Sequence, residues 1–167
     1  MVLSIEGSNY KVEDILYINT AYMIMGLYVI TIYFKSQKDP LILEYNNKDE
    51  YDNIVKYYTS GLSGLLTDKT TEVVETNVFV KLENQMSCSK EDLFYLCVKN
   101  ISNIDKYKDI DGFYKIDVTF SDGEVIQFEY LSEDEMKKDY KKLLKYFNNE
   151  NNGGQEIDDS DYYDSDF

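Results

Sequence analysis

The chain contains no arginine, no histidine and no tryptophan, and its 167 residues include one proline and two cysteines. Histidine is the usual side chain for proton transfer near neutral pH and for metal binding, and it commonly activates a serine or cysteine nucleophile. Arginine supplies the bidentate fork that recognises phosphate groups and guanine. These absences argue against the common hydrolases, histidine-ligated metal sites and arginine-based DNA readers.

The two cysteines, Cys88 and Cys97, are too few and too far apart for a CxxC zinc or redox motif. No signal peptide precedes them, so we expect a cytoplasmic protein with free thiols, in the host cytoplasm if a phage encodes it. A strand pair could still place the two cysteines opposite each other, and the spacing alone therefore leaves a disulfide open.

Cofactor motifs are missing as well. The glycines are isolated turn residues without GxxxxGK or GxGxxG spacing. The acids before Gly112 are only loosely similar to a calcium loop, because the first ligand position would fall on Tyr107 and the twelfth on Val118. We therefore predict no catalytic, cofactor-binding or metal-binding residues, and a protein that is not an enzyme.

The chain is rich in acidic and apolar residues. There are 32 acidic residues against 17 lysines, a formal net charge of −15, and 43% of the residues are hydrophobic, which is ample for a core. Ile15 to Phe34 carries no charge, but tyrosine, asparagine and threonine are spread through it and Gly26 interrupts it. This segment is predicted to form two strands rather than a membrane span.

The stretch from Gly112 to Phe147 specifies its structure most completely. Apolar and polar residues alternate before and after a turn at Gly123, which predicts a β-hairpin. Ser132 and Glu135 then have capping-box spacing, and apolar residues follow at the period of a helix. The predicted unit is a hairpin covered by a helix.

A similar order of motifs occurs in the first half of the chain. Val12–Ile18 matches Lys90–Leu96, and Gly26–Phe34 matches Gly112–Phe120. Asn47 and Glu50 repeat the three-residue capping spacing. The fold class is therefore predicted as α+β, with two tandem antiparallel β-meander-plus-helix units packed together. The first unit is residues 1–60, the linker is 61–75 and the second unit is 76–148.

The predicted strands of the first unit are apolar on both faces, because Leu27, Val29 and Tyr33 occupy the face that is polar in the second unit. A patch of this size needs a cover. We expect these three side chains to be buried between layers, against the other half of the chain or against another molecule.

Residues 149–167 are predicted to form a disordered acidic tail. Its end, Asp161–Phe167, resembles the tips of bacterial and phage single-stranded-DNA-binding proteins, and the resemblance implies that the tail recruits a protein partner. The body of the chain departs from that family, since it lacks arginine and tryptophan and is acidic rather than a single OB barrel. A tail that only maintains solubility is the other interpretation.

By elimination, the sequence favours a non-catalytic inhibitor that occupies the basic, nucleic-acid-binding surface of a partner enzyme, in one form as a nucleic-acid mimic. In its small size, its acidity and its lack of catalytic and cofactor motifs, the chain resembles phage and mobile-element inhibitors of host defence, such as anti-CRISPR and anti-restriction proteins. We expect a monomer or homodimer that contacts neither a membrane nor nucleic acid directly. The predicted contacts are Glu44, Asp49, Glu50, Asp117, Glu129, Asp134, Glu135 and Phe167.

Two alternatives remain open at this stage. One is a single-stranded-DNA-binding replication protein with a partner-recruiting tail, for which the lysines between Lys137 and Lys145 would form the basic patch. The other is a bacterial immunity protein, an acidic plug for a basic toxin, which relies on the same electrostatics.

Overall fold

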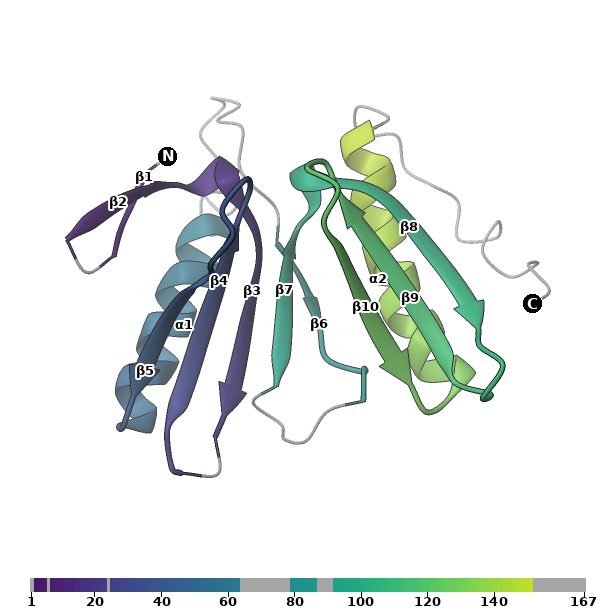
Figure 1. Ribbon diagram of the computed structural model, residues 1–167, viewed down its shortest axis with the longest axis horizontal. Coiled ribbons are helices and arrows are strands. Elements are labelled where there is room, and N and C mark those ends of the chain that lie inside the picture. Colours follow the sequence, from purple (N-terminus) through teal and green to yellow (C-terminus); the bar gives the residue numbers. More distant parts are fainter. Residues whose placement is uncertain (1, 6, 24, 64–78, 87–91, 152–167) are drawn as a thin grey trace.

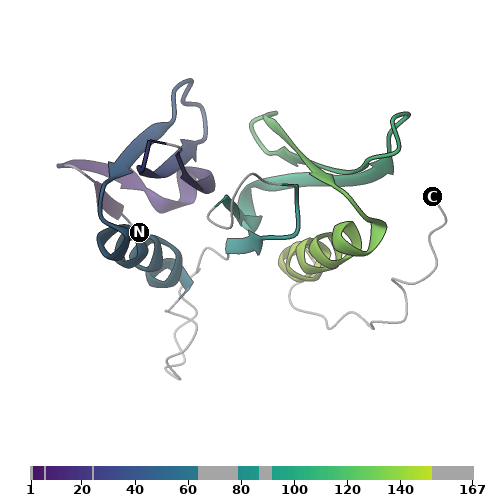
Figure 2. The same ribbon diagram turned by 90° about the horizontal axis from the view of Figure 1, so that it is seen from below.

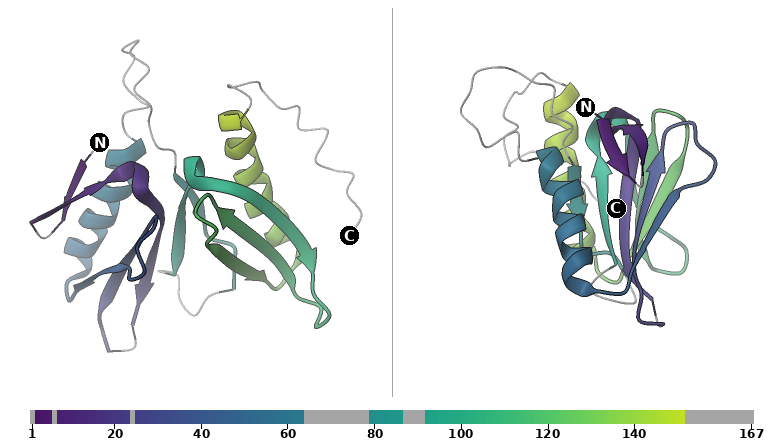
Figure 3. Two further views of the ribbon diagram at one scale, coloured as in Figure 1. Left: turned by 45° about the horizontal axis from the view of Figure 1, so that its top comes forward. Right: turned by 90° about the vertical axis from the view of Figure 1, so that its left-hand side faces the viewer.

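Both helices lie on one side of a layer of antiparallel strands in the computed structural model, which describes residues 2–5, 7–23, 25–63, 79–86 and 92–151 (Figures 1, 2 and 3). The prediction of an α+β fold is confirmed. The linker from residue 64, Cys88 and the tail from residue 152 lie outside the described residues.

The larger sheet has five strands in the order β5-β4-β3-β7-β6. Its strands are β3 (Ile15–Tyr22), β4 (Tyr28–Phe34), β5 (Leu41–Tyr45), β6 (Phe79–Leu82) and β7 (Leu93–Cys97). The central pairing of β3 with β7 joins strands from opposite sides of the predicted linker. The two halves of the chain therefore share one sheet.

The smaller sheet has three strands in the order β10-β9-β8, and its hairpin follows the predicted pattern. Its strands are β8 (Ile101–Lys108), β9 (Tyr114–Phe120) and β10 (Val125–Tyr130). Val118 pairs with Ile126 and Ile116 with Phe128, so the apolar face is in register across the hairpin. Gly123 has a φ of 93° in the connecting turn, a conformation that favours glycine.

The two helices start at the predicted caps. In α1 (Lys48–Ser63) the side-chain Oδ1 of Asn47 accepts the backbone N–H of Asp49 at 2.8 Å. In α2 (Glu133–Asn151) the hydroxyl of Ser132 accepts the backbone N–H of Glu135 at 3.2 Å. Each cap satisfies an amide that has no partner within the helix. Both helices continue past the ends expected from the sequence, residues 60 and 148.

The remaining elements give the two halves the same element order. A hairpin of β1 (Val2–Ile5) and β2 (Ser8–Lys11) precedes the 3-10 turn η1 (Val12–Asp14), as β6 and β7 precede η3 (Val98–Asn100). The hairpins differ in pairing, because β1 and β2 form a separate two-stranded sheet. When the elements of the two halves are paired in chain order, β3 corresponds to β8. The sequence match of Val12–Ile18 with Lys90–Leu96 instead aligned β3 with β7. The tandem repeat and its boundaries remain predictions.

Two apolar clusters form the core on either side of β6 and β7. Phe79 and Tyr95 pack against the cluster that α1 covers, and Val80, Leu82 and Leu96 belong to the cluster that α2 covers. This alternation along β6 and β7 directs successive side chains to opposite faces. The pair of strands is consequently a wall with apolar side chains on both faces.

Leu27, Val29 and Tyr33 are only half-buried, so the expectation that the other half of the chain buries them is wrong, and their burial against another molecule stays a prediction. β6 and β7 instead pack against an apolar cluster on each face, with Phe79 and Tyr95 half-buried on one face and Val80, Leu82 and Leu96 buried on the other. The contact between the sheets at this point is aromatic, since Tyr33 stacks on Tyr17 and Tyr17 stacks on Phe120 with ring centroids 4.2 and 5.6 Å apart.

Three further observations bear on the sequence predictions. No helix among the described residues is long and apolar enough to cross a membrane. The part of the chain that is described holds no group of three or more acidic or cysteine side chains arranged as metal ligands. Cys97 is buried, and its sulfur accepts the Nδ2 of Asn100 at 3.7 Å.

Candidate partner-binding surface

The two helices begin at the same edge of the molecule, the lower edge in Figure 1. The first turn of α1 contributes Asp49 and Glu50, and the first turn of α2 contributes Glu133, Asp134 and Glu135. β6 ends and β7 begins between the two helices, toward this edge (Figure 1). We call these five acids and the two that flank the β6–β7 connection, Glu83 and Asp92, the acidic edge.

Lysines neutralise only part of this edge. Glu133 accepts Lys137 at 2.8 Å, one helical turn further on, and Glu83 lies 3.3 Å from Lys81. Among the described residues, none of the ion pairs involves Asp49, Glu50, Asp134 or Glu135. Four acids in the first turns of two separate helices, Asp49, Glu50, Asp134 and Glu135, therefore have no ion-pair partner among the described residues.

These acids also have a structural reason to be where they are. Carboxylates near a helix start interact favourably with the unpaired amides and with the positive end of the helix dipole. That local effect explains each first turn by itself. It does not explain why the two helix starts are at one edge, which follows from both helices running in the same direction across the strand layer (Figure 1).

The predicted contacts on the strands have a different setting. Asp117 accepts the Nε2 of Gln127 at 3.0 Å, and the hydroxyl of Tyr107 lies 3.4 Å from the same carboxylate oxygen. Partial burial and the neighbouring Asp117 raise the pKa of Tyr107. Asp117 is thus held in a hydrogen-bond network on the outer face of the three-stranded sheet.

Glu129 lies in an ion-pair network on that same face. Lys115 Nζ is 2.8 Å from Asp109 and 3.2 Å from Glu129, and hydrogen bonds to these two carboxylates raise the pKa of Lys115. Glu44 is exposed on β5, directly opposite Val29 in the larger sheet. Of the eight predicted contacts, Asp49, Glu50, Asp134 and Glu135 lie in the two helix starts at this edge, and Phe167 lies outside the described residues.

The predicted lysine patch on α2 is partly occupied by local partners. Lys137 pairs with Glu133, and Lys142 donates to the carbonyl of Lys81 at 2.8 Å and lies 3.7 Å from Glu83. Engaged lysines release fewer counterions on binding a phosphate backbone. The patch is therefore less basic than the sequence suggests.

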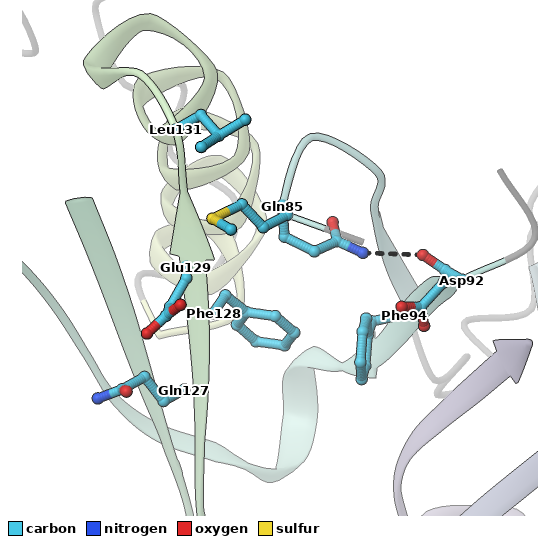
Figure 4. Close-up of a pocket in the computed structure, with 8 residues that line it drawn as sticks. Gln85, Asp92, Phe94, Gln127, Phe128, Glu129 and Leu131 are labelled. Carbon is cyan, nitrogen blue, oxygen red and sulfur yellow. Dashed lines mark hydrogen bonds between the residues drawn. The ribbon is translucent and has the colours of Figure 1, made fainter. Parts of the chain in front are cut away.

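A cleft opens beside the acidic edge, between the β6–β7 connection and β10 (Figure 4). Its volume is about 570 Å³. Met86 N–H donates to the carbonyl of Glu129 at 2.7 Å, and this bond holds the connection against β10. The lining residues are Gln85, Met86, Asp92, Phe94, Gln127, Phe128, Glu129 and Leu131.

The cleft and the buried polar groups around it were not predicted from the sequence. Gln85 lies in a short irregular connection and shows no pattern that marks it as buried. Asp139 was detectable in principle, since it follows Met136 by three residues and so shares the apolar face of α2. Its burial contradicts the usual assignment of aspartate to the solvent-facing side of a helix.

No family model, curated protein or solved structure matches this chain.

Proposed function

We propose that the protein is a non-catalytic inhibitor that binds a basic surface of a partner protein through its acidic edge. One observation carries the proposal: α1 and α2 run in the same direction, so their acidic first turns project from the same edge (Figure 1). Negative charge concentrated on one side of a molecule speeds encounter with a positive surface and orients the two molecules as they meet.

The partner that suits this surface is a nucleic-acid-handling enzyme, because a channel that binds a phosphate backbone is lined with lysine and arginine. A protein that occupies such a channel competes with nucleic acid, which is the way a phage inhibitor of host defence would act in the host cytoplasm. An immunity protein for a basic toxin rests on the same electrostatics and is distinguished by the identity of its partner.

The test is affinity capture from the native host on the immobilised full-length chain, followed by elution in a salt gradient and mass spectrometry. The expected result is an enzyme with a basic channel that elutes at moderate salt and loses activity when the purified protein is added. Attraction between exposed charges is screened over about 10 Å at 0.1 M salt, which explains the expected salt dependence.

A pair of matched variants ties the result to the acidic edge. The test variant, Glu50→Gln with Asp134→Asn, removes two exposed acids from the edge. The control, Asp39→Asn with Glu124→Gln, removes the same charge from the β4–β5 and β9–β10 turns at the opposite end of the strands (Figure 1). We expect only the first variant to elute at lower salt. A salt-insensitive complex, or equal effects of both variants, would overturn the proposal.

A further inference from the structure

We propose that a second copy of this chain packs on the outer face of strands β3, β4 and β5. This face of the larger sheet is turned away from α1 (Figures 2 and 3). The contact uses a strand face rather than the acidic edge, and it is independent of the proposed function.

The alternation of side chains along the strands defines this face. Ile30, Ile32 and Leu43 are buried in the cluster that α1 covers, so the residues next to them in each strand point to the opposite side of the sheet. The pairing register aligns these residues across the three strands. The side chains on the outer face are Asn19, Ala21, Val29, Thr31, Ile42 and Glu44.

The outer face carries much less charge than the corresponding face of the smaller sheet. Glu44 is the one charged side chain among its six residues, and Ile42 is 56% exposed. The smaller sheet instead presents Lys115, Asp117 and Glu129, which form ion pairs and hydrogen bonds. A strand face that stays in water normally carries polar side chains of this kind. The outer face of β3, β4 and β5 is therefore better suited to contact with another protein surface.

The lack of charge indicates which surface covers this face. A basic surface, which the acidic edge attracts, finds only Glu44 to pair with here and loses the hydration of its other cations. A strand face that is itself nearly uncharged loses little hydration on contact, and the same face of a second copy has this property. A two-fold axis brings identical patches together, and two sheets pack face to face about 10 Å apart.

Charge outside the contact sets its salt dependence. Glu44 lies at the border of the face, since β5 is the edge strand of the larger sheet. Its carboxylate repels that of the second copy, and the two chains repel each other at a net charge of −15 each. Salt screens this repulsion without weakening apolar contact, so we expect high salt to favour the dimer. A complex with a basic partner has the opposite salt dependence.

The test is sedimentation-velocity ultracentrifugation of the full-length chain over a series of protein concentrations, in low and in high salt. We expect an equilibrium that shifts from monomer to dimer as concentration and salt increase. Ile42→Asp places a charge in the contact and should weaken the dimer at least about tenfold, because an ionised group is costly to bury. Ile110→Asp makes the same substitution at an exposed residue in the β8–β9 turn and should leave the affinity unchanged (Figure 1).

Two further measurements locate the contact and control for misfolding. Glu44→Gln should strengthen the dimer about twofold to fivefold at low salt, a gain that loss of folding does not produce. Glu50→Gln removes the same charge from α1, on the other side of the sheet, and should have a smaller effect. In a mixture of labelled and unlabelled chains, NMR should show intermolecular contacts at the methyl groups of Val29 and Ile42.

A chain that stays monomeric at every concentration and salt level overturns the proposed dimer. A dimer that salt weakens, equal effects of Ile42→Asp and Ile110→Asp, or intermolecular contacts confined to other residues overturn it as well. These failures are separate from failure of the proposed function. A monomeric chain that captures a basic partner removes only the dimer, and a salt-strengthened dimer that retains no basic partner removes only the proposed function.

Discussion

The Oδ2 atom of Asp139 on α2 lies 3.1 Å from the hydroxyl of Tyr130 at the end of β10, and both residues are fully buried. The same carboxyl group accepts the backbone N–H and the side-chain Nδ2 of Asn84 at 3.1 and 2.7 Å. Through Asp139 the helix, the smaller sheet and the β6–β7 connection are bonded to one another.

We predict that Asp139→Ala is strongly destabilising, because it leaves three buried or half-buried donors without an acceptor. The expected loss is about 3 kcal/mol in the free energy of unfolding, measured by urea denaturation. Lys138→Ala, an exposed neighbour on the same helix, should change it by less than about 0.5 kcal/mol. Equal effects of the two substitutions would show that the junction contributes nothing.

A second prediction concerns Asn100, a 3% exposed side chain in η3. Its Nδ2 donates to the carbonyls of Glu13 and Ile15 at 2.9 and 2.7 Å, and so joins η3 to the start of β3. Asn100→Ala should cost about 2 kcal/mol in urea denaturation, since it leaves buried carbonyls unpaired. Asn103→Ala, on the exposed side of β8, serves as the matched control and should have little effect.

The helix cap at Ser132 gives a third prediction. Ser132→Ala removes the acceptor of the Glu135 amide and should lower stability by about 1 kcal/mol. Ser132→Asn keeps an oxygen that can cap the helix and should remain close to the unaltered chain in thermal unfolding. If alanine and asparagine behave alike, the hydroxyl does not act as a cap.

The Asp109–Lys115 pair predicts a pH dependence. The hydrogen bond from Lys115, with smaller contributions from the amides of Phe113 and Asp111, lowers the pKa of Asp109 in the folded state. A folded-state pKa below the unfolded one means that this pair stabilises the fold above the ordinary aspartate range and loses its effect as the pH falls through the lowered value. NMR titration of the Asp109 carboxyl carbon should show the low midpoint.

Substitution of the cation tests the cause of that shift. Lys115→Met should move the Asp109 midpoint upward, whereas Lys108→Met should leave it in place because the paired cation is Lys115. An unchanged midpoint in Lys115→Met would assign the low value to the backbone amides alone.

The fifth prediction separates protein binding from nucleic-acid binding. Because the net charge is −15 and Lys137 and Lys142 already have acidic partners, we expect no mobility shift of a single-stranded oligonucleotide even at low salt. Salt-dependent binding that disappears in Lys141→Glu would instead favour the single-stranded-DNA-binding alternative.

The sequence by itself determined the features that depend on neighbours in the chain. The hairpin from Tyr114 to Tyr130 follows from alternation around Gly123, and the helix starts follow from the caps Asn47 and Ser132. In each case the groups that must be paired lie within a few residues, or in one hairpin, so their spacing is visible in the sequence. The charge excess and the absence of arginine and histidine are equally independent of the fold.

Only the tertiary structure decided how these pieces meet. The pairing of β3 with β7, the packing of an apolar cluster on each face of β6 and β7 and the position of two acidic helix starts at one edge depend on how distant segments pack. Asp139 shows the physical reason: its partner Asn84 is 55 positions away in the chain. A buried carboxyl group is favourable only where such partners converge on it, and local spacing carries no information about residues that are brought together by packing.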